Sequence, residues 1–212
     1  VTGTDTEVGK TRISVGLIKV LQQQGLRVAA MKPVASGCEW RDGQLQNEDA
    51  LALSQQADIK LPYLQVNPYA FEPAIAPHLA AKQVGETISL TVLESQFAAM
   101  QLQADAVVVE GAGGWLVPLN DQQTIADLAK ALKLPVVLVV AIKLGCINHA
   151  LLTVQAIADS GLKLVGWVAN DFLDDSQSTA IIQSLKQRIA APCLGIVPKL
   201  AEDEDASVYL TL

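Results

Sequence analysis

Gly3-Thr4-Asp5-Thr6-Glu7-Val8-Gly9-Lys10-Thr11 is the stretch that decides the fold of this 212-residue chain. Its glycines let the backbone turn so that successive N–H groups point at anionic oxygens. Lys10 can then reach the β- and γ-phosphates of a nucleotide, and the Thr11 hydroxyl can bind Mg²⁺. The apolar helix predicted after it turns its positive end toward the same anion. Five residues, rather than the usual four, separate Gly3 from Gly9, which indicates a variant phosphate loop. The alternative is an ordinary glycine turn before a helix.

The composition is that of a globular, acidic protein. Half of the residues are apolar, 17% are charged, and 15 basic against 22 acidic side chains give a net charge of −7. Such a field repels nucleic acid and anionic membranes, so we expect neither as a partner. The longest apolar run, Val136 to Ile142, is far shorter than a bilayer span. Three scattered cysteines and no visible signal peptide favour a cytoplasmic location.

Apolar periodicity predicts alternating strands and helices along the chain. The predicted strands are 27–32, 105–110, 135–141, 164–169 and 194–197. The predicted helices are 11–24 (stopped by Gly25), 47–56, 90–102, 124–132, 147–158 and 176–189. Residues 33–48 are predicted to be mostly loop, and 61–85 resist a regular assignment. This order predicts a three-layer, doubly wound, mostly parallel α/β sheet with the P-loop nucleotide-binding fold. We expect one domain over residues 1–212, with a first strand that begins before Val1.

Polar residues follow several of these strands at the edge where ligands of parallel sheets bind. Glu110 ends a buried strand, so its carboxylate needs a partner. Together with Thr11 it is a candidate Mg²⁺ ligand, and Asp49 is a third. Asp49 taken alone is better explained as a helix-start carboxylate. Asn170 ends another strand at the same edge.

Lys32 ends the strand that precedes Pro33. A second lysine near Lys10 would create a pocket for more negative charge than ATP carries, which favours a substrate that is anionic or becomes so beside the γ-phosphate. A solvated lysine at a strand end is an equally good interpretation of the spacing.

The sequence resembles the dethiobiotin synthetase family over nearly its whole length. The segments that carry the resemblance are 1–11, 31–37 (Met-Lys-Pro-Val-Ala-Ser-Gly), 73–80, 109–115 (Val-Glu-Gly-Ala-Gly-Gly-Trp), 143–149 (Lys-Leu-Gly-Cys-Ile-Asn-His) and 166–170. The family also uses the lengthened phosphate loop.

The resemblance implies an enzyme of biotin biosynthesis, a ligase that needs ATP and Mg²⁺. Its substrates would be 7,8-diaminononanoate and CO₂ or bicarbonate. CO₂ forms a carbamate on one amine, and the carbamate oxygen attacks the γ-phosphate to give a carbamic–phosphoric anhydride. The second amine then closes the ring of dethiobiotin, and ADP and phosphate leave. Such phosphoryl transfer depends on positioning and charge rather than on a nucleophilic side chain.

The resemblance also implies roles for particular residues. Lys32, Lys10, Thr6 and Glu7 would be catalytic, with Thr11, Asp49 and Glu110 on Mg²⁺. Ser36 would contact the diamine. In a homodimer, the Gly145, Cys146, Ile147 and Asn148 helix start of one subunit would receive the carboxylate of substrate bound to the other. The ATP-binding set would be Glu7, Val8, Gly9, Lys10, Thr11, Arg12, Asp49, Glu110, Gly111, Ala112, Gly113, Asn170, Asp171, Pro198, Lys199 and Leu200. Charged Lys199 departs from the family pattern at the adenine contacts.

Two other functions are weighed against this one. A partitioning or septum-placement ATPase has a similar loop but usually carries a basic surface or a C-terminal amphipathic membrane helix, and this acidic chain shows neither. The related amide-forming synthases of corrinoid precursors need a further glutamine-hydrolysing domain, for which 212 residues leave no room.

Overall fold

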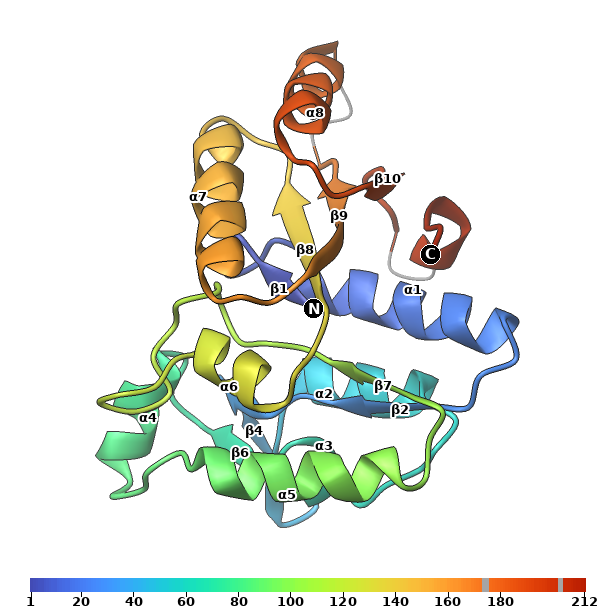
Figure 1. Ribbon diagram of the computed structural model, residues 1–212. Helices are drawn as coiled ribbons and strands as arrows, with labels where there is room; N and C mark the ends of the chain where they lie inside the picture. Colours follow the sequence, from blue (N-terminus) through green and yellow to red (C-terminus); the bar gives the residue numbers. More distant parts are fainter. Residues whose placement is uncertain (173–175, 202–203) are drawn as a thin grey trace.

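The computed structural model describes residues 1–172, 176–201 and 204–212 (Figure 1). Its strands are β1 (Thr2–Gly3), β2 (Val28–Met31), β3 (Val34–Ser36), β4 (Glu39–Arg41), β5 (Gln44–Gln46), β6 (Tyr69–Phe71), β7 (Ala106–Val109), β8 (Val136–Ala141), β9 (Leu164–Asn170) and β10 (Cys193–Val197). Its helices are α1 (Lys10–Gln23), α2 (Glu48–Gln56), α3 (Tyr63–Val66), α4 (Pro77–Gln83), α5 (Leu90–Gln101), α6 (Ile125–Ala131), α7 (Cys146–Asp159) and α8 (Ser176–Arg188), followed by the 3₁₀ turn η1 (Ala206–Tyr209).

The central sheet is parallel. Strands β1, β8, β9 and β10 pair in that order, and β2 pairs with β7 in the same sense. The two parts meet beside β1, because Gly111 N donates to Val1 O (3.0 Å) and Gly3 forms a parallel bridge with Gly114. The strand order is therefore β2-β7-β1-β8-β9-β10, and the predicted doubly wound parallel sheet is confirmed.

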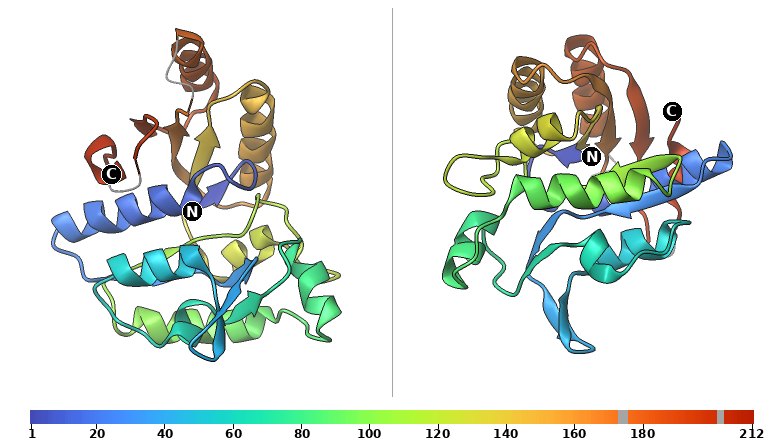
Figure 2. Two further views of the ribbon diagram at one scale, coloured as in Figure 1. Left: turned by 180° about the vertical axis from the view of Figure 1, so that it is seen from behind. Right: turned by 60° about the horizontal axis from the view of Figure 1, so that its bottom comes forward.

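Helices cover both faces of this sheet, as the alternation of side chains along each strand requires. On β2, Val28 and Ala30 pack toward α1 and α2, whereas Ala29 and Met31 pack toward α5 and α6. On β8, alternate residues face α1 on one side and α7 with α8 on the other. Figure 2 shows α1 and α2 side by side on one face. The result is the expected three-layer α/β architecture.

Local signals account for several helix ends. After α1, Gly25 has φ +85°, its N–H donates to Gln22 O, and Leu26 N–H donates to Leu21 O, which is a Schellman motif. Thr124 and Asp127 form a reciprocal capping box at the start of α6. These helix ends lie within a residue or two of their predicted positions.

The prediction of a loop over residues 33–48 is wrong, and residues 61–85, for which the sequence predicts no regular element, also contain helices and a strand. Residues 33–48 contain β3 and the β4–β5 hairpin, and residues 61–85 contain α3, β6 and α4. Strand β3 exists because it pairs in parallel with β6, about thirty-five residues later, which no local pattern reports. The hairpin turns at Asp42-Gly43, both with positive φ (51° and 78°), and such a dipeptide is a hairpin signal that the sequence did offer.

Within the described ranges, no helix is long and apolar enough to cross a membrane.

Candidate functional site

The phosphate loop follows β1 and ends at Lys10, the first residue of α1. Gly9 has φ +88°, and a Cβ there would lie 2.0 Å from Asn170 Nδ2, so only glycine fits. Glu7 is not glycine yet has φ 57°. A non-glycine residue in this left-handed region is uncommon and is found most often at functional turns. The loop therefore has the conformation of a ligand-binding turn at the helix N-terminus.

A cavity of about 670 Å³ opens beside this loop, and we call it the phosphate cavity. It brings together side chains from the loop, the ends of β2 and β3, the start of α2 and the turns before α4 and after β7. Its lining residues are Thr6, Glu7, Gly9, Lys10, Thr11, Lys32, Ala35, Ser36, Asn47, Asp49, Ala74, Ile75, Ala76, Pro77, Ala112, Gly113 and Val117.

Lys32 joins two carboxylates within the site. Its Nζ lies 2.5 Å from Glu110 Oε1 and 3.0 Å from Asp49 Oδ2, and it donates more weakly to Gly111 O (3.4 Å). Lys32 is 4% exposed and Glu110 is fully buried. The Thr11 hydroxyl donates to the same Glu110 oxygen (3.0 Å). The alternative of a solvated strand-end lysine is therefore wrong.

The two lysines differ in charge environment. Burial and the neighbouring Lys32 ammonium lower the pKa of Lys10 to about 8, and its Nζ donates to the Asp5 carbonyl (2.9 Å). Burial would also lower the pKa of Lys32, but Glu110 and Asp49 outweigh it and hold that pKa above its ordinary value. The Lys32 ammonium, with help from Thr11, likewise keeps the pKa of Asp49 low despite its partial burial. Lys32 is thus a fixed cation, whereas Lys10 is the more easily deprotonated of the two.

The oxygen donors of the site fit a nucleotide-bound Mg²⁺. Thr11, Asp49 and Glu110 converge around Lys32, and Glu110 Oε2 is a buried oxygen with no hydrogen-bond partner in the part of the chain described. No cluster of three or more His, Cys, Asp and Glu that could hold a metal occurs among the described residues. Two carboxylates and a hydroxyl suit an ion that keeps waters and takes phosphate oxygens as its remaining ligands.

Part of the wall of the phosphate cavity is apolar. Ala74, Ile75, Pro77 and Val117 line it, and Ser36 adds a buried hydroxyl that has no hydrogen-bond partner among the described residues. An apolar wall with one free hydroxyl fits an aliphatic ligand that carries a few polar groups. Asn47 and the segment before α4 line the cavity but were not among the predicted site residues, although Pro77 at the first helical position is a recognised helix-start signal.

A second set of predicted ATP residues lies outside the lining of the phosphate cavity, and we call it the outer group: Arg12, Asn170, Asp171, Pro198, Lys199 and Leu200. One of its members contacts the loop, and two others bond to backbone carbonyls elsewhere. Asn170 Nδ2 donates to Val8 O (2.9 Å), Asp171 N donates to Val197 O, and Arg12 reaches the Ala201 carbonyl. Lys199 is exposed. Val8, Glu110 and Gly111 also do not line the cavity, although Glu110 and Gly111 contact Lys32.

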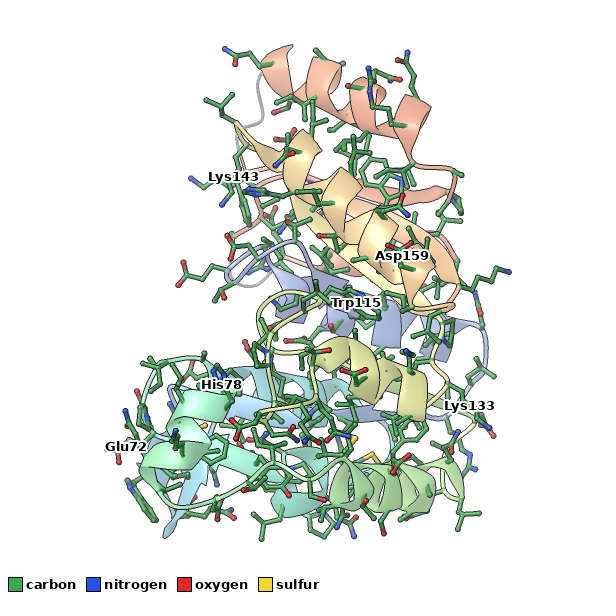
Figure 3. The ribbon with its side chains drawn as sticks, turned by 60° about the vertical axis from the view of Figure 1, so that its left-hand side comes forward. Glu72, His78, Trp115, Lys133, Lys143 and Asp159 are labelled. Atoms are coloured by element: carbon green, nitrogen blue, oxygen red, sulfur yellow. The ribbon has the colours of Figure 1, made fainter. Side chains whose placement is uncertain are left out.

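The predicted carboxylate-binding helix start lies at the beginning of α7, and none of its four residues lines the phosphate cavity. Gly145 has φ +89° and precedes the helix, Cys146 is buried, and Asn148 is exposed. Lys143, labelled in Figure 3, lies in the exposed turn just before this helix, and Leu144 is 98% exposed. Within one chain, then, this group is separate from the lysines.

These features define a class of protein. A lengthened phosphate loop between a buried parallel strand and a helix, with a lysine-lined cavity at the sheet edge, is the site of a P-loop nucleotide-binding protein. A family profile described as an AAA domain matches residues 1–207. Among solved structures, the cell division protein MinD of Aquifex aeolicus superposes with TM-score 0.59 at 14% identity, covering 98% of this chain and 90% of that one. A ParA family ATPase of Chlorobium tepidum gives TM-score 0.56 at 15% identity, covering 95% and 84%. At such identities the likeness shows the fold alone.

Sequence relatives are far more similar. The ATP-dependent dethiobiotin synthetase of Pseudomonas aeruginosa (strain UCBPP-PA14) is 54% identical over 98% of this chain and 92% of its own length. That of Cellvibrio japonicus is 52% identical over 100% and 94%, and one from Escherichia coli O157:H7 is 49% identical over 97% and 92%. The chain belongs to the family of ATP-dependent dethiobiotin synthetases, which are ligases of biotin biosynthesis. This family membership sets aside the septum-placement alternative.

Proposed function

We propose that this protein joins 7,8-diaminononanoate and CO₂ into dethiobiotin, with ATP converted to ADP and phosphate. One amine of the substrate takes up CO₂ and loses a proton to become a carbamate. A carbamate oxygen attacks the γ-phosphorus, and the bond to the ADP oxygen breaks. The second amine attacks the carbonyl carbon of the resulting anhydride and loses its proton, and phosphate departs as the ring closes.

The observation that carries this proposal is the convergence of Lys10 and Lys32 on one cavity beside the phosphate loop. Lys10, at the helix start, would bind the γ-phosphate and the carbamate oxygen next to it. Lys32, held as a cation by two carboxylates, would bind and polarise the carbamate. Two ammonium groups suit a reaction in which two anions must approach each other.

The remaining cavity residues would bind and orient the reactants. Thr6 and Glu7 line the cavity on the loop side and would contact phosphate and substrate. Thr11, Asp49 and Glu110 would hold Mg²⁺, which neutralises charge on the β- and γ-phosphate oxygens when bound. Ser36 and the apolar wall would receive the diamine and its methylene chain. The loop and Gly111, Ala112 and Gly113 would bind ATP together with Arg12 and Asp171, and Asn170 with the loop Pro198-Lys199-Leu200 would recognise adenine.

We further propose a homodimer, in which Gly145 to Asn148 of one subunit bind the carboxylate of substrate held by the other. The support is that Gly145 provides no side-chain cap for α7, so the N–H groups of Ile147 and Asn148 in its first turn suit a carboxylate, while the four residues stay outside the cavity of their own chain. Leu116, Leu144 and Leu152 are exposed apolar side chains that a partner would cover. The proposal also includes a single domain over residues 1–212 and a cytoplasmic location, which the free thiols of Cys38, Cys146 and Cys193 favour.

The test is phosphate release with Mg-ATP and bicarbonate, measured with and without 7,8-diaminononanoate, together with mass spectrometry of the product. We expect release to depend on the diamine and to match dethiobiotin formed one to one. Phosphate release that is indifferent to the diamine would instead indicate a nucleotide-driven switch and overturn the proposal.

A further inference from the structure

A chain of hydrogen bonds connects Asn47, which lines the cavity, to the backbone of Lys32 through Tyr63 and Asn67, which do not line it. Asn47 N–H donates to the Tyr63 hydroxyl (2.7 Å), which donates to Asn67 Oδ1 (2.8 Å). The Asn67 amide nitrogen then donates to the backbone carbonyl of Lys32 (2.7 Å) and to that of Tyr69 (3.2 Å). Asn67 is fully buried, whereas Asn47 and Tyr63 are half-buried, so the network runs from the cavity lining into the protein interior.

Each polar atom in the network has a defined use. The Tyr63 hydroxyl has one proton, which goes to Asn67, and it accepts the proton of Asn47 N–H. Burial raises the pKa of Tyr63 to about 12, so the hydroxyl keeps its proton at neutral pH. Both protons of the Asn67 amide go to carbonyls. Removing the Tyr63 oxygen would leave a buried amide oxygen without its donor, which folded proteins avoid.

The two ends of the network are two parts of the proposed catalytic site. One end is the backbone of Lys32, whose N–H is also fixed by the Val66 carbonyl (2.8 Å). The other end is Asn47, which caps α2 through its bond from Ala50 N–H, two residues before Asp49. Lys32 and Asp49 come from different elements, and the segment that contains α3 connects them through Tyr63 and Asn67.

We propose that Tyr63 and Asn67 are positioning residues, which set the Lys32 ammonium and the Asp49 carboxylate in register for carbamate and Mg²⁺. This inference rests on the proposed function for the identity of those ligands. Neither residue lines the cavity, so both act through Lys32 and the start of α2. Misplacement of a reacting group by about 1 Å can lower a rate by about 100-fold. A small shift of Lys32 relative to the start of α2 should therefore change the rate measurably.

The experiment compares Tyr63→Phe with Tyr69→Phe. Tyr69 is the matched control, because its hydroxyl also accepts a backbone N–H at a helix start, that of Ser89 before α5 (3.1 Å), while the network uses only the Tyr69 backbone carbonyl, which Tyr69→Phe keeps. The readouts are kcat, the Mg²⁺ concentration at half-maximal rate, ATP binding by calorimetry with and without Mg²⁺, and the midpoint of thermal unfolding.

For Tyr63→Phe we expect kcat to fall about 10-fold and the Mg²⁺ requirement to rise about 3- to 10-fold. ATP binding without Mg²⁺ should stay within about twofold, since the phosphate loop takes no part in the network. Tyr69→Phe should change none of these ligand properties, whatever happens to its unfolding midpoint. A Tyr63→Phe protein with a lower unfolding midpoint but wild-type kcat and Mg²⁺ dependence would overturn the inference.

Asn67→Asp tests the bond between the network and the Lys32 backbone, and it replaces Tyr63→Phe as the test if that variant does not fold. It keeps the shape and the acceptor for Tyr63 but loses the donor to the Lys32 carbonyl, so the same split between kcat and metal-free ATP binding is expected. Wild-type ligand properties here would count equally against the inference. If the wild-type protein releases no diamine-dependent phosphate, the proposed function fails instead, and Mg²⁺-dependent ATP binding still tests the register of the site.

Discussion

The phosphate cavity and the outer group differ in how tightly the chain holds them. Beside the cavity, Lys32 and Glu110 are buried and joined by a 2.5 Å contact, Lys32 also pairs with Asp49, and the Lys10 ammonium donates to the Asp5 carbonyl. In the outer group, Lys199 is exposed and Pro198 and Leu200 are half-buried. Asn170 and Asp171 of this group are buried, Asn170 donates to Val8 O of the loop, and Arg12 donates to the Ala201 carbonyl.

The difference bears on how each region can act on a ligand. Buried and paired charges keep their geometry before a ligand arrives, so their electrostatic effect needs little reorganisation. Exposed side chains are screened by salt and lose conformational entropy when they bind. We therefore expect substitutions in the cavity to affect the chemical step and substitutions of exposed side chains in the outer group to affect ATP affinity weakly.

The largest effect is expected for Lys32→Gln. Loss of this buried ammonium should lower kcat about 1,000-fold, because it would stabilise charge that develops in the transition state. ATP affinity should change by less than about threefold, since Lys10 and the loop amides remain. Steady-state kinetics and calorimetry check both values, with exposed Lys163→Gln as the control. Near-normal turnover would discredit the proposed role of Lys32.

Next is Glu110→Gln, which removes a charge that both Lys32 and Thr11 contact. We expect the Mg²⁺ requirement to rise about 10- to 100-fold. The unfolding free energy should also fall by about 3 kcal/mol, because a buried lysine loses its closest carboxylate. Magnesium titrations and chemical denaturation measure the two effects, and exposed Glu94→Gln should show neither. An unchanged Mg²⁺ requirement of the Glu110→Gln protein would show that Glu110 is not a metal ligand.

The convergence of Lys10, Lys32 and Glu110 could be predicted from sequence, because the carboxyl ends of neighbouring parallel strands must meet at one sheet edge. The contact of Lys32 with Asp49 could not be derived in this way. Asp49 lies on α2, whose place depends on packing against α1 and β2 and on the Tyr63–Asn67 network. No periodicity within one segment reports such contacts between segments.

The elements of the fold likewise separate into those that local sequence predicts and those that depend on contacts between segments. Local sequence patterns predict buried strands such as β8 and β9 and capped helices such as α6. Strand β3 does not, because its three residues become a strand only by pairing with β6. The sequence likewise predicts no element for the wall of the cavity before α4, since this proline-rich segment follows neither the helical nor the strand period.

Asn148→Ala tests the proposal that residues 145–148 of one subunit bind the carboxylate of substrate held by the other. It extends the comparison of regions to a second copy of the chain. We expect the KM for the diamine to rise about tenfold, the size of a lost hydrogen bond to a charged group, and the KM for ATP to stay nearly constant. Exposed Gln155→Ala, further along α7, is the control. Mixing Asn148→Ala with Lys32→Gln subunits should restore activity at low diamine, because one site in each mixed dimer is then intact. Absence of restoration would place the whole site within one subunit.

The smallest effect is expected for Lys199→Gln in the outer group. An exposed lysine contributes little to binding in water, so the KM for ATP should rise less than about threefold with kcat unchanged. That small difference should shrink further when ionic strength increases from about 0.05 to 0.2 M, since the screening length shortens. Asn170→Ala is the informative companion, because Asn170 is buried and supports the loop through Val8, and it should raise the KM for ATP more than Lys199→Gln does. A tenfold or salt-independent effect of Lys199→Gln would mean that bound ATP holds Lys199 as firmly as Glu110 holds Lys32. The difference in exposure between the phosphate cavity and the outer group would then exist only in the protein without ATP.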